Sequence, residues 1–348
     1  MTNGQEQAAS QPYLLRVENL TKAFSGVEVL KNLSVGIRAG EIMGVIGENG
    51  AGKSTFMKLI SGVYAPTRGQ IYFDEKPVRI LNTIAAQRLG IAMIPQEFNL
   101  IDTLRVYENI FLGRELRRGG VLDRSRMIEE SRRLFATLLT DVSPDAQVSD
   151  LSVAQKQMVE IAKAVSQESR ILIMDEPTTV LSRAEIDSLF AIMRDFADKG
   201  GAVFFVSHKL GEVREVCDRV LVLRDGDLIS IDPIKNLNEH EMARRMVGRD
   251  LSEAFPDKAV VKSEPPILAV RNLAVPGVLN GISFTLQAGE ILGVAGLMGA
   301  GRTELGETLM GLRKAQAGEI EIEGKPVRIH SPRDAMRAGI AYLSEDRQ

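Results

Sequence analysis

The sequence predicts an α/β fold: a sheet domain with an inserted helical subdomain, followed by a partial second copy of the same domain. Three observations support this fold class. Short runs rich in valine and isoleucine alternate with segments of helical periodicity, which is typical of α/β proteins. A glycine-rich turn lies between one of these runs and a helical segment. The chain also repeats itself at a constant spacing, which indicates a duplicated domain.

In the first copy, the alternating pattern predicts five strands and five helices. The expected strands are Ile42–Ile46, Ile91–Ile94, Ile171–Met174, Val203–Val206 and Val220–Leu223. The expected helices are Gly52–Ser61, Arg124–Leu139, Val153–Ser166, Arg183–Ala197 and Glu239–Val247. Residues 104–165 contain few strand signals, so we expect this segment to be the helical subdomain inserted into the sheet domain.

The repeat defines the domain boundaries. Leu30–Ala92 aligns without gaps on Leu279–Ala341, and 25 of the 63 aligned positions are identical. We expect a disordered tail over residues 1–13, a first domain over 14–249, a charged linker over 250–266 and an incomplete second domain over 267–348. The chain would then stop shortly after a strand of the second copy, with the edge of an unfinished sheet exposed.

Composition limits the classes of function. The chain has 348 residues, 44% hydrophobic and 26% charged, which is ordinary for a folded protein of about two domains. A net charge of −3 provides no basic field for nucleic acid. The single cysteine, Cys217, excludes an intrachain disulfide, and we expect it to be a small buried apolar residue. No run of 18 apolar residues exists, so membrane association would depend on a protein partner.

The most informative motif is the glycine-rich turn, which follows a predicted strand and opens a predicted helix. This is the context that a phosphate-binding P-loop requires. Its residues are Gly47, Glu48, Asn49, Gly50, Ala51, Gly52, Lys53, Ser54 and Thr55. Glycines let backbone N–H groups approach phosphate oxygens, and the helix N-terminus favours negative charge. We expect Lys53 to contact the β- and γ-phosphates of ATP, and the Ser54 hydroxyl to be a ligand of Mg²⁺.

A second motif is an apolar strand that ends in two carboxylates, Asp175 and Glu176. In a parallel sheet, the end of this strand lies beside the P-loop. Asp175 is expected to hold Mg²⁺ through water, and Glu176 to orient or deprotonate the water that attacks ATP. Many strands end in an aspartate, so this assignment depends on the P-loop.

Together these motifs and their spacing resemble those of ABC ATPases, a P-loop NTPase fold. The resemblance implies that Gln96 is the Q-loop glutamine, a metal and catalytic contact, and that His208 is the switch histidine. Leu151, Ser152 and Gln155 match the signature motif at a helix start, which contacts nucleotide in this family. Phe24 lies where the family stacks an aromatic residue on adenine, although a purely packing role fits Phe24 equally well.

The resemblance can be narrowed to a subfamily in four segments. These segments are similar to the corresponding parts of ATPases from ribose, galactose and xylose importers. In the first copy they are the helix Leu151–Ala164 and the segment Met246–Arg249; in the second copy they are Gly296–Glu304 and Tyr342–Arg347. A typical member of that family continues for roughly 150 residues more. We therefore favour a truncated sequence.

The chain departs from the family pattern at several positions. Ala154 replaces the usual signature glycine, and Ser182 replaces the usual D-loop aspartate. In the second copy Arg302 stands at the position of Lys53, so we expect weak nucleotide binding or no turnover there. ABC domains resemble one another in holding ATP between one P-loop and the other domain's signature. The Ala154 signature would then face the Arg302 site.

The resemblance implies an ATPase that energises import of a simple sugar, at the cytoplasmic face of the membrane. Its partners would be two transmembrane permease subunits and an extracytoplasmic sugar-binding protein, with no nucleic acid. Two alternatives remain open at this point: a soluble ABC-type ATPase that acts on ribosomes or nucleic acid, and an ATP-binding fragment without catalysis.

Overall fold

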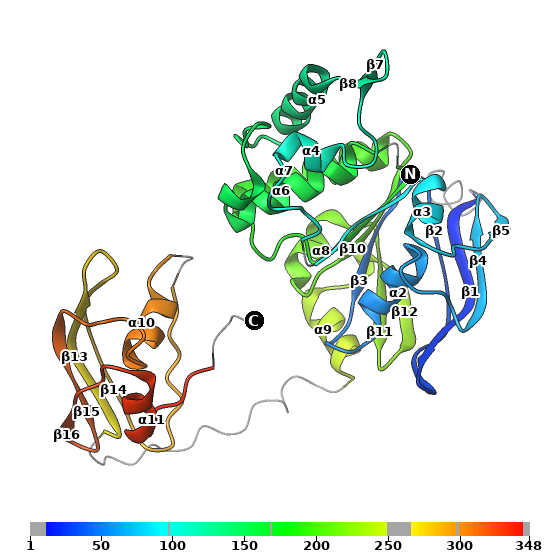
Figure 1. Ribbon diagram of the computed structural model, residues 1–348. Helices are drawn as coiled ribbons and strands as arrows, with labels where there is room; N and C mark the ends of the chain where they lie inside the picture. The colour runs from blue at the N-terminus through cyan, green and yellow to red at the C-terminus, as the bar shows by residue number, and fades with distance from the viewer. Residues whose placement is uncertain (1–11, 97, 168, 249–265, 297–298, 344–348) are drawn as a thin grey trace. The chain divides into compact units, whose positions relative to one another are not determined.

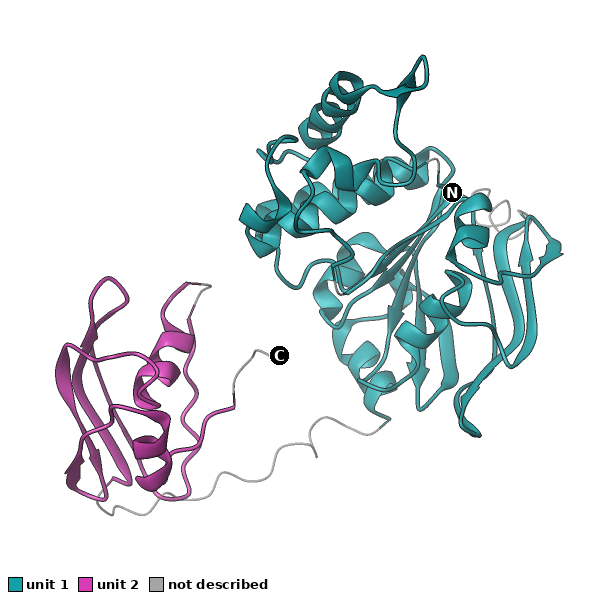
Figure 2. Ribbon diagram, viewed as in Figure 1, with its two compact units in different colours: residues 1–254 teal, residues 255–348 magenta. Residues whose placement is uncertain are grey.

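The computed structural model describes residues 12–96, 98–167, 169–248, 266–296 and 299–343. It contains two compact units, residues 1–254 and 255–348, each described here by itself (Figure 2). Most of the expected tail and linker, Arg249, residues 297 and 298, and residues 344–347 lie outside the described residues.

Unit 1 is built around a six-stranded sheet with the order β12-β11-β3-β10-β9-β6 (Figure 1). Neighbouring strands from β11 to β6 run parallel, and β12 is antiparallel to β11. The strands are β3 (Ile42–Ile46), β6 (Ile91–Ile94), β9 (Ile171–Asp175), β10 (Ala202–Val206), β11 (Arg219–Arg224) and β12 (Asp227–Pro233). The five predicted strands are therefore confirmed to within one residue at each end.

The sheet separates two apolar cores. Along β3, Ile42 and Ile46 belong to one buried cluster, whereas Met43 and Val45 belong to the other. This alternation follows from the two-residue period of a strand, which directs successive side chains to opposite faces. All residues of β3, β9 and β10 are buried, which explains why these strands read as continuous apolar runs.

Helices lie next to the strands of this sheet along the chain. They are α2 (Lys53–Ile60), α3 (Thr83–Arg88), α7 (Arg183–Asp198), α8 (Leu210–Val216) and α9 (Glu239–Val247), with a short 3₁₀ turn η2 (Ile234–Asn236). The predicted helices α2, α7 and α9 are present with ends within one residue. Cys217 follows α8 and is buried as expected, and burial raises the pKa of its thiol.

A second, antiparallel sheet with the order β2-β1-β4-β5 covers one side of the unit. Its strands are β1 (Tyr13–Phe24), β2 (Val27–Arg38), β4 (Arg68–Phe73) and β5 (Lys76–Val78). Tyr13, which the sequence analysis placed in the tail, instead begins β1 and pairs with Arg38. Its aromatic ring also lies under the Arg38 guanidinium, which gives this residue an ordered position.

The segment 104–165 contains α4 (Val106–Ile110), α5 (Arg124–Thr137), the 3₁₀ turn η1 (Val148–Asp150) and α6 (Val153–Val165). It also contains a hairpin of two short strands, β7 (Arg117–Arg118) and β8 (Val121–Leu122). The helices α4, α5 and α6 contact one another and lie together beyond one end of the parallel sheet (Figure 1). We refer to residues 104–165 as the helical subdomain.

Unit 2 repeats the antiparallel sheet of unit 1, with the order β14-β13-β15-β16. Its elements are β13 (Leu268–Val275), β14 (Leu279–Leu286), α10 (Arg302–Leu309), β15 (Ala317–Ile322), β16 (Lys325–Val327) and α11 (Pro332–Arg337). Residues 291–296, which align with β3, form no strand, and Ile291 is 98% exposed. The strand expected shortly before the end of the chain is also absent from the described residues 340–343.

The difference between the two copies has a simple physical reason. In unit 1, β3 is flanked by β10 and β11, and β6 is paired with β9. Among the described residues of unit 2, no strand pairs with residues 291–296 or 340–343. An apolar segment without a neighbouring strand leaves its backbone groups unpaired, so it does not become a strand.

None of the helices in the described ranges combines the length and apolarity needed to cross a bilayer.

Candidate nucleotide site

The glycine-rich turn joins β3 to α2 and adopts a conformation that side chains would obstruct. A Cβ atom on Gly47 would collide with the backbone oxygen of Leu223. Gly52, the N-cap residue of α2, has a φ of 100°, in the left-handed region that glycine favours. The turn therefore presents backbone N–H groups at the start of a helix, where an anion is stabilised.

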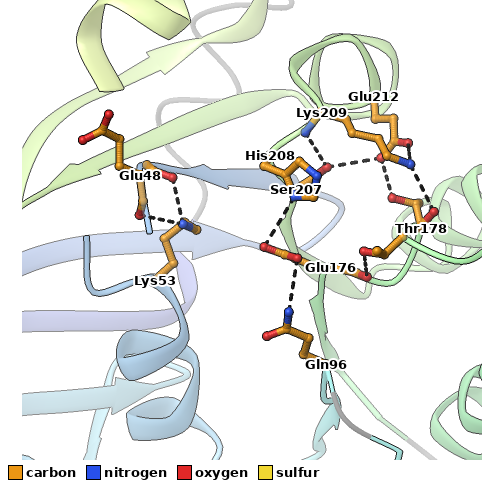
Figure 3. A network of polar contacts seen from close by, with 11 residues as sticks. Glu48, Lys53, Gln96, Glu176, Thr178, Ser207, His208, Lys209 and Glu212 are labelled. Atoms are coloured by element: carbon orange, nitrogen blue, oxygen red, sulfur yellow. Dashed lines mark hydrogen bonds and ion pairs between the residues drawn. The ribbon is translucent and has the colours of Figure 1, made fainter. Parts of the chain in front are cut away.

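Lys53 is the first residue of α2 and is only 7% exposed. Its Nζ donates hydrogen bonds to the backbone oxygens of Gly47, at 2.8 Å, and Glu48, at 3.0 Å (Figure 3). Burial lowers the pKa of Lys53, whereas the charges of Glu176 and Asp175 oppose that shift. The ammonium group thus lies within the turn, with carbonyl oxygens as its partners.

Asp175 is the last residue of β9 and is 3% exposed. It is paired with Val206 of β10, and β10 in turn pairs with β3, whose end opens the glycine-rich turn. Burial raises the pKa of Asp175, and a hydrogen bond with the Ser54 side chain lowers it in part. The structure therefore brings together Asp175 and Ser54, two of the three residues predicted from the sequence to contact a metal; Gln96 is the third.

Glu176 follows directly and lies between two other predicted site residues (Figure 3). Its Oε2 accepts a hydrogen bond from Gln96 Nε2 at 3.4 Å, and its Oε1 lies 3.5 Å from His208 Nδ1. Gln96, Glu176 and His208 follow the carboxyl ends of the parallel strands β6, β9 and β10. In open parallel sheets, ligands bind just beyond these carboxyl ends of the strands. The φ of Glu176 is 52°, which is unusual for a residue other than glycine and indicates local strain.

The signature residues lie elsewhere, at the start of α6 in the helical subdomain. Ser152 is the N-cap: its Oγ accepts a hydrogen bond from the Gln155 backbone, and its own N–H donates to Gln155 Oε1 at 3.0 Å. This reciprocal capping box satisfies two backbone donors of the helix terminus. Leu151 precedes the cap and packs against the core, as does Ala154.

Phe24 is the last residue of β1 and is 40% exposed. Its ring makes an edge contact with the ring of Tyr64, at 5.1 Å between centroids, and Lys22 Nζ lies 4.8 Å from its centroid. One part of the Phe24 ring is therefore packed, and the exposed part remains available for stacking.

Four residues around Glu176 and His208 were not singled out from the sequence: Thr178, Ser207, Lys209 and Glu212. They form a network of hydrogen bonds and an ion pair beside Glu176 and His208 (Figure 3). A sequence signal does exist, because Glu212 follows His208 by four residues at the start of a helix. A glutamate at such a position is usually exposed, however, and only the contacts reveal its burial.

The aligned segment of unit 2 keeps part of this geometry. Gly299 and Gly301 have φ values of 77° and 86°, and α10 begins at Arg302, as α2 begins at Lys53. Arg302 is exposed, in contrast to the buried Lys53. The reason is that the neighbouring residues 291–296 lack the parallel strands that surround Lys53 in unit 1.

Comparison with known proteins is consistent with these observations. Residues 30–179 and 279–348 match the ABC transporter family. A putative ribose/galactose/methyl galactoside import ATP-binding protein of Burkholderia cenocepacia is 47% identical over 335 residues, which are 96% of this chain and 65% of that protein. A ribose import ATP-binding protein of Clostridium tetani is 44% identical over 99% of this chain and 68% of its own length. The chain thus spans about two thirds of the length of these relatives.

Solved structures give the same result for the fold. CbiO1 of Clostridium perfringens, part of an ABC transporter complex, aligns with a TM-score of 0.57 at 26% identity, over 70% of this chain and 98% of its own. A nucleotide-free ATP-binding cassette from an ABC transporter aligns with a TM-score of 0.58 at 23% identity, over 68% of this chain and 95% of its own. The predicted fold class is therefore confirmed, and the chain belongs to the ABC transporter family.

Proposed function

We propose that this chain is the ATP-binding and ATP-hydrolysing subunit that energises import of a simple sugar through a membrane transporter. The main observation behind the proposal is the position of Glu176. It lies between Gln96 and His208, at the carboxyl ends of the parallel strands, where the glycine-rich turn with Lys53 also lies. The names of the relatives, which are ribose and galactose import ATP-binding proteins, support the substrate class.

The glycine-rich turn would hold the triphosphate of ATP. Its backbone N–H groups and the dipole of α2 favour phosphate oxygens. Lys53 Nζ would exchange its present partners, the oxygens of Gly47 and Glu48, for β- and γ-phosphate oxygens. Glu48, Asn49, Gly50, Ala51 and Thr55 complete the cradle, Phe24 would stack on the adenine, and Leu151, Ser152 and Gln155 would contact nucleotide across a domain interface.

The donor set fits Mg²⁺ carried in with the nucleotide. Magnesium prefers oxygen ligands and binds through a few protein groups together with substrate phosphates. Ser54 and Asp175 supply a hydroxyl and a carboxylate that already interact, and Gln96 supplies an amide oxygen. Among the described residues, no group of three or more His, Cys, Asp or Glu could hold a resident metal. When bound, Mg²⁺ would neutralise charge on the phosphates.

Hydrolysis requires a positioned water molecule and an acceptor for its proton. The Glu176 carboxylate would accept a proton from water as the water oxygen bonds to the γ-phosphorus and the bond to the leaving ADP oxygen breaks. His208, 3.5 Å from Glu176, would contact the same region and orient the reacting groups. Gln96 would link this centre to the helical subdomain, because it lies between β6 and that subdomain.

The partners would be two transmembrane permease subunits and an extracytoplasmic sugar-binding protein, with this chain bound to the permease at the cytoplasmic face. A cavity of about 800 Å³ between the helical subdomain and the antiparallel sheet offers a site for a permease segment. Its lining includes Phe111 and Arg114 from the helical subdomain and Arg88 and Arg170 from the sheet domain. Movement between these two parts would thus be transmitted to the membrane.

The decisive test is Mg-ATP binding by Lys53→Ala, measured by calorimetry, with exposed Lys199→Ala as a matched control. We expect Lys53→Ala to weaken binding by about tenfold or more, because a charge-assisted contact to phosphate is lost. Glu176→Gln should bind Mg-ATP normally and hydrolyse it slowly. Unchanged binding by Lys53→Ala would refute the proposal. If Glu176→Gln and the parent turned over ATP equally, Glu176 would not be a catalytic group, and only the ATP-binding role of the chain would remain.

A further inference from the structure

A buried carboxylate lies beside the catalytic pair, on the helix that follows His208. Glu212 belongs to the first turn of α8 and is 8% exposed. Its Oε2 accepts hydrogen bonds from Thr178 Oγ1, at 2.6 Å, and from Ser207 Oγ, at 3.2 Å. Its Oε1 lies 3.1 Å from Lys209 Nζ. These contacts all converge on one carboxylate (Figure 3).

Lys209 adds two further links within the same network. Its Nζ donates to the backbone oxygen of Thr178 at 3.1 Å, and its backbone N–H donates to Ser207 Oγ at 3.1 Å. Thr178 and Ser207 are each 2% exposed, so the hydroxyl bonds are shielded from water. A buried carboxylate is costly unless it is paired and hydrogen-bonded, and here each oxygen has a partner.

The network joins the two loops that carry the proposed catalytic groups. Thr178 follows Glu176 by two residues, and Ser207 immediately precedes His208. Glu176 also has a strained φ of 52°, and such a conformation persists only when the surrounding structure holds it. Thr179 Oγ1 donates to the Glu176 backbone oxygen at 3.1 Å, which restrains the same turn.

We propose that Glu212, with Lys209, is a positioning residue that clamps the loop after Glu176 to the loop before His208 and so fixes the relative placement of the two catalytic groups. This inference rests on the proposed ATPase function. The contacts of Glu212 are with Thr178, Ser207 and Lys209, not with the glycine-rich turn. Glu212 acts through Thr178 and Ser207, and its loss should misplace Glu176 and His208 without removing either one.

The proposal predicts a separation of kcat from KM. A small misplacement of catalytic groups can lower the chemical rate strongly, so we expect Glu212→Leu to reduce kcat for ATP by about tenfold or more. Mg-ATP affinity should stay within about twofold, because the P-loop is untouched. Glu212→Gln, which keeps an acceptor for Thr178, should retain more activity than Glu212→Leu. Glu215→Gln, on the same helix and exposed, is the matched control.

A second measurement does not depend on turnover. Hydrogen exchange should accelerate at the backbone N–H groups of Glu176 and Lys209 in Glu212→Leu, whereas the N–H groups of β10, Val203 to Val206, should remain protected. Thr178→Val should reproduce the effect, and the double variant should be no worse than Glu212→Leu, since both remove one unit. This pattern would support the clamp even where steady turnover is slow.

The inference would be overturned by an unchanged kcat in Glu212→Leu, or by a loss of Mg-ATP affinity equal to the loss of kcat. Faster exchange throughout β10 would also overturn it, because that result would indicate a purely structural role. A different result would refute the proposed ATPase function itself: Mg-ATP binding by Lys53→Ala that equals binding by the parent. Parent-like exchange at Glu176 and Lys209 in Glu212→Leu refutes the clamp alone.

Discussion

The carboxylate of Glu160 accepts a 2.6 Å hydrogen bond from the backbone N–H of Asn99. Glu160 lies in α6, the helix that begins with the signature motif, and Asn99 follows Gln96 by three residues. Lys163, one turn further along α6, donates to the backbone oxygen of Asn99 at 3.0 Å. The signature helix therefore holds both backbone groups of one residue in the segment after Gln96, which couples the two motifs mechanically.

This contact predicts different effects for two substitutions of Glu160. The residue is 4% exposed, and burial raises its pKa, whereas Lys163 and the Asn99 bond oppose that shift. Glu160→Ala leaves the Asn99 N–H without its partner, which should lower the free energy of unfolding by about 1–3 kcal/mol. Glu160→Gln keeps an acceptor and removes a buried charge, so its stability at neutral pH should equal or exceed that of the parent.

Urea unfolding of the three proteins at pH 7 would measure these differences. Lys156→Met is a suitable control. Lys156 lies on the same helix as Glu160 and pairs with the exposed Asp102, and such surface pairs contribute little to stability. Equal destabilisation by Glu160→Ala and Lys156→Met would contradict the role assigned to the Asn99 contact.

Asp175 makes the stability of the unliganded protein dependent on pH. Burial raises its pKa in the folded state, so the folded protein retains this proton at pH values where the unfolded chain has lost it. The associated stability is present below the unfolded pKa and is lost as pH rises through the folded pKa. Asp175→Asn cannot ionise, and at neutral pH it should raise the free energy of unfolding.

The measurement is the difference in unfolding free energy between Asp175→Asn and the parent, without nucleotide, from pH 3 to pH 8. We expect the difference to grow with rising pH and then to reach a plateau. Mg²⁺ should strengthen ATP binding by the parent more than by the variant. A difference that is constant over the whole range would show that ionisation of Asp175 carries no cost.

The sequence was sufficient for the parallel sheet because its strands are buried on both faces. β3 and β6 were predicted with the correct ends, since their apolar runs contain no polar residue that blurs the boundary. The antiparallel sheet was missed. Its long strands β1 and β2 mix charged and apolar residues, and their pairing shifts register four times, so no clean two-residue alternation exists.

The same contrast applies to the site. Lys53, Asp175 and Glu176 follow apolar strands at motif spacing, and this spacing can be read directly. Glu212 could not be found in that way, because its partners Thr178 and Ser207 come from two different loops. A single buried carboxylate is recognised only when the tertiary contacts that neutralise its cost are known.

The second copy predicts the stoichiometry of nucleotide binding. Arg302 is exposed where Lys53 is buried, and residues 291–296 lack the flanking strands that shape the first turn. A bulky, exposed guanidinium in an open turn does not reproduce the compact charge of the Lys53 site. Calorimetric titration of this chain with Mg-ATP should therefore saturate at about one tight site per chain, and Arg302→Ala should leave that site unchanged. Two sites of equal affinity would refute this interpretation.

The last prediction concerns Ala154, which occupies the usual position of the signature glycine. It lies in the first turn of α6 and packs against the main core. Ala154→Gly should lower the free energy of unfolding by about 0.5–1 kcal/mol, because glycine has more conformational freedom to lose in a helix. In an assembly with both domains, this signature would face the Arg302 site, so the substitution should leave most ATPase activity unchanged. Paired measurements of urea unfolding and ATP hydrolysis would check both statements. A several-fold change in hydrolysis would mean that this signature serves the Lys53 site instead.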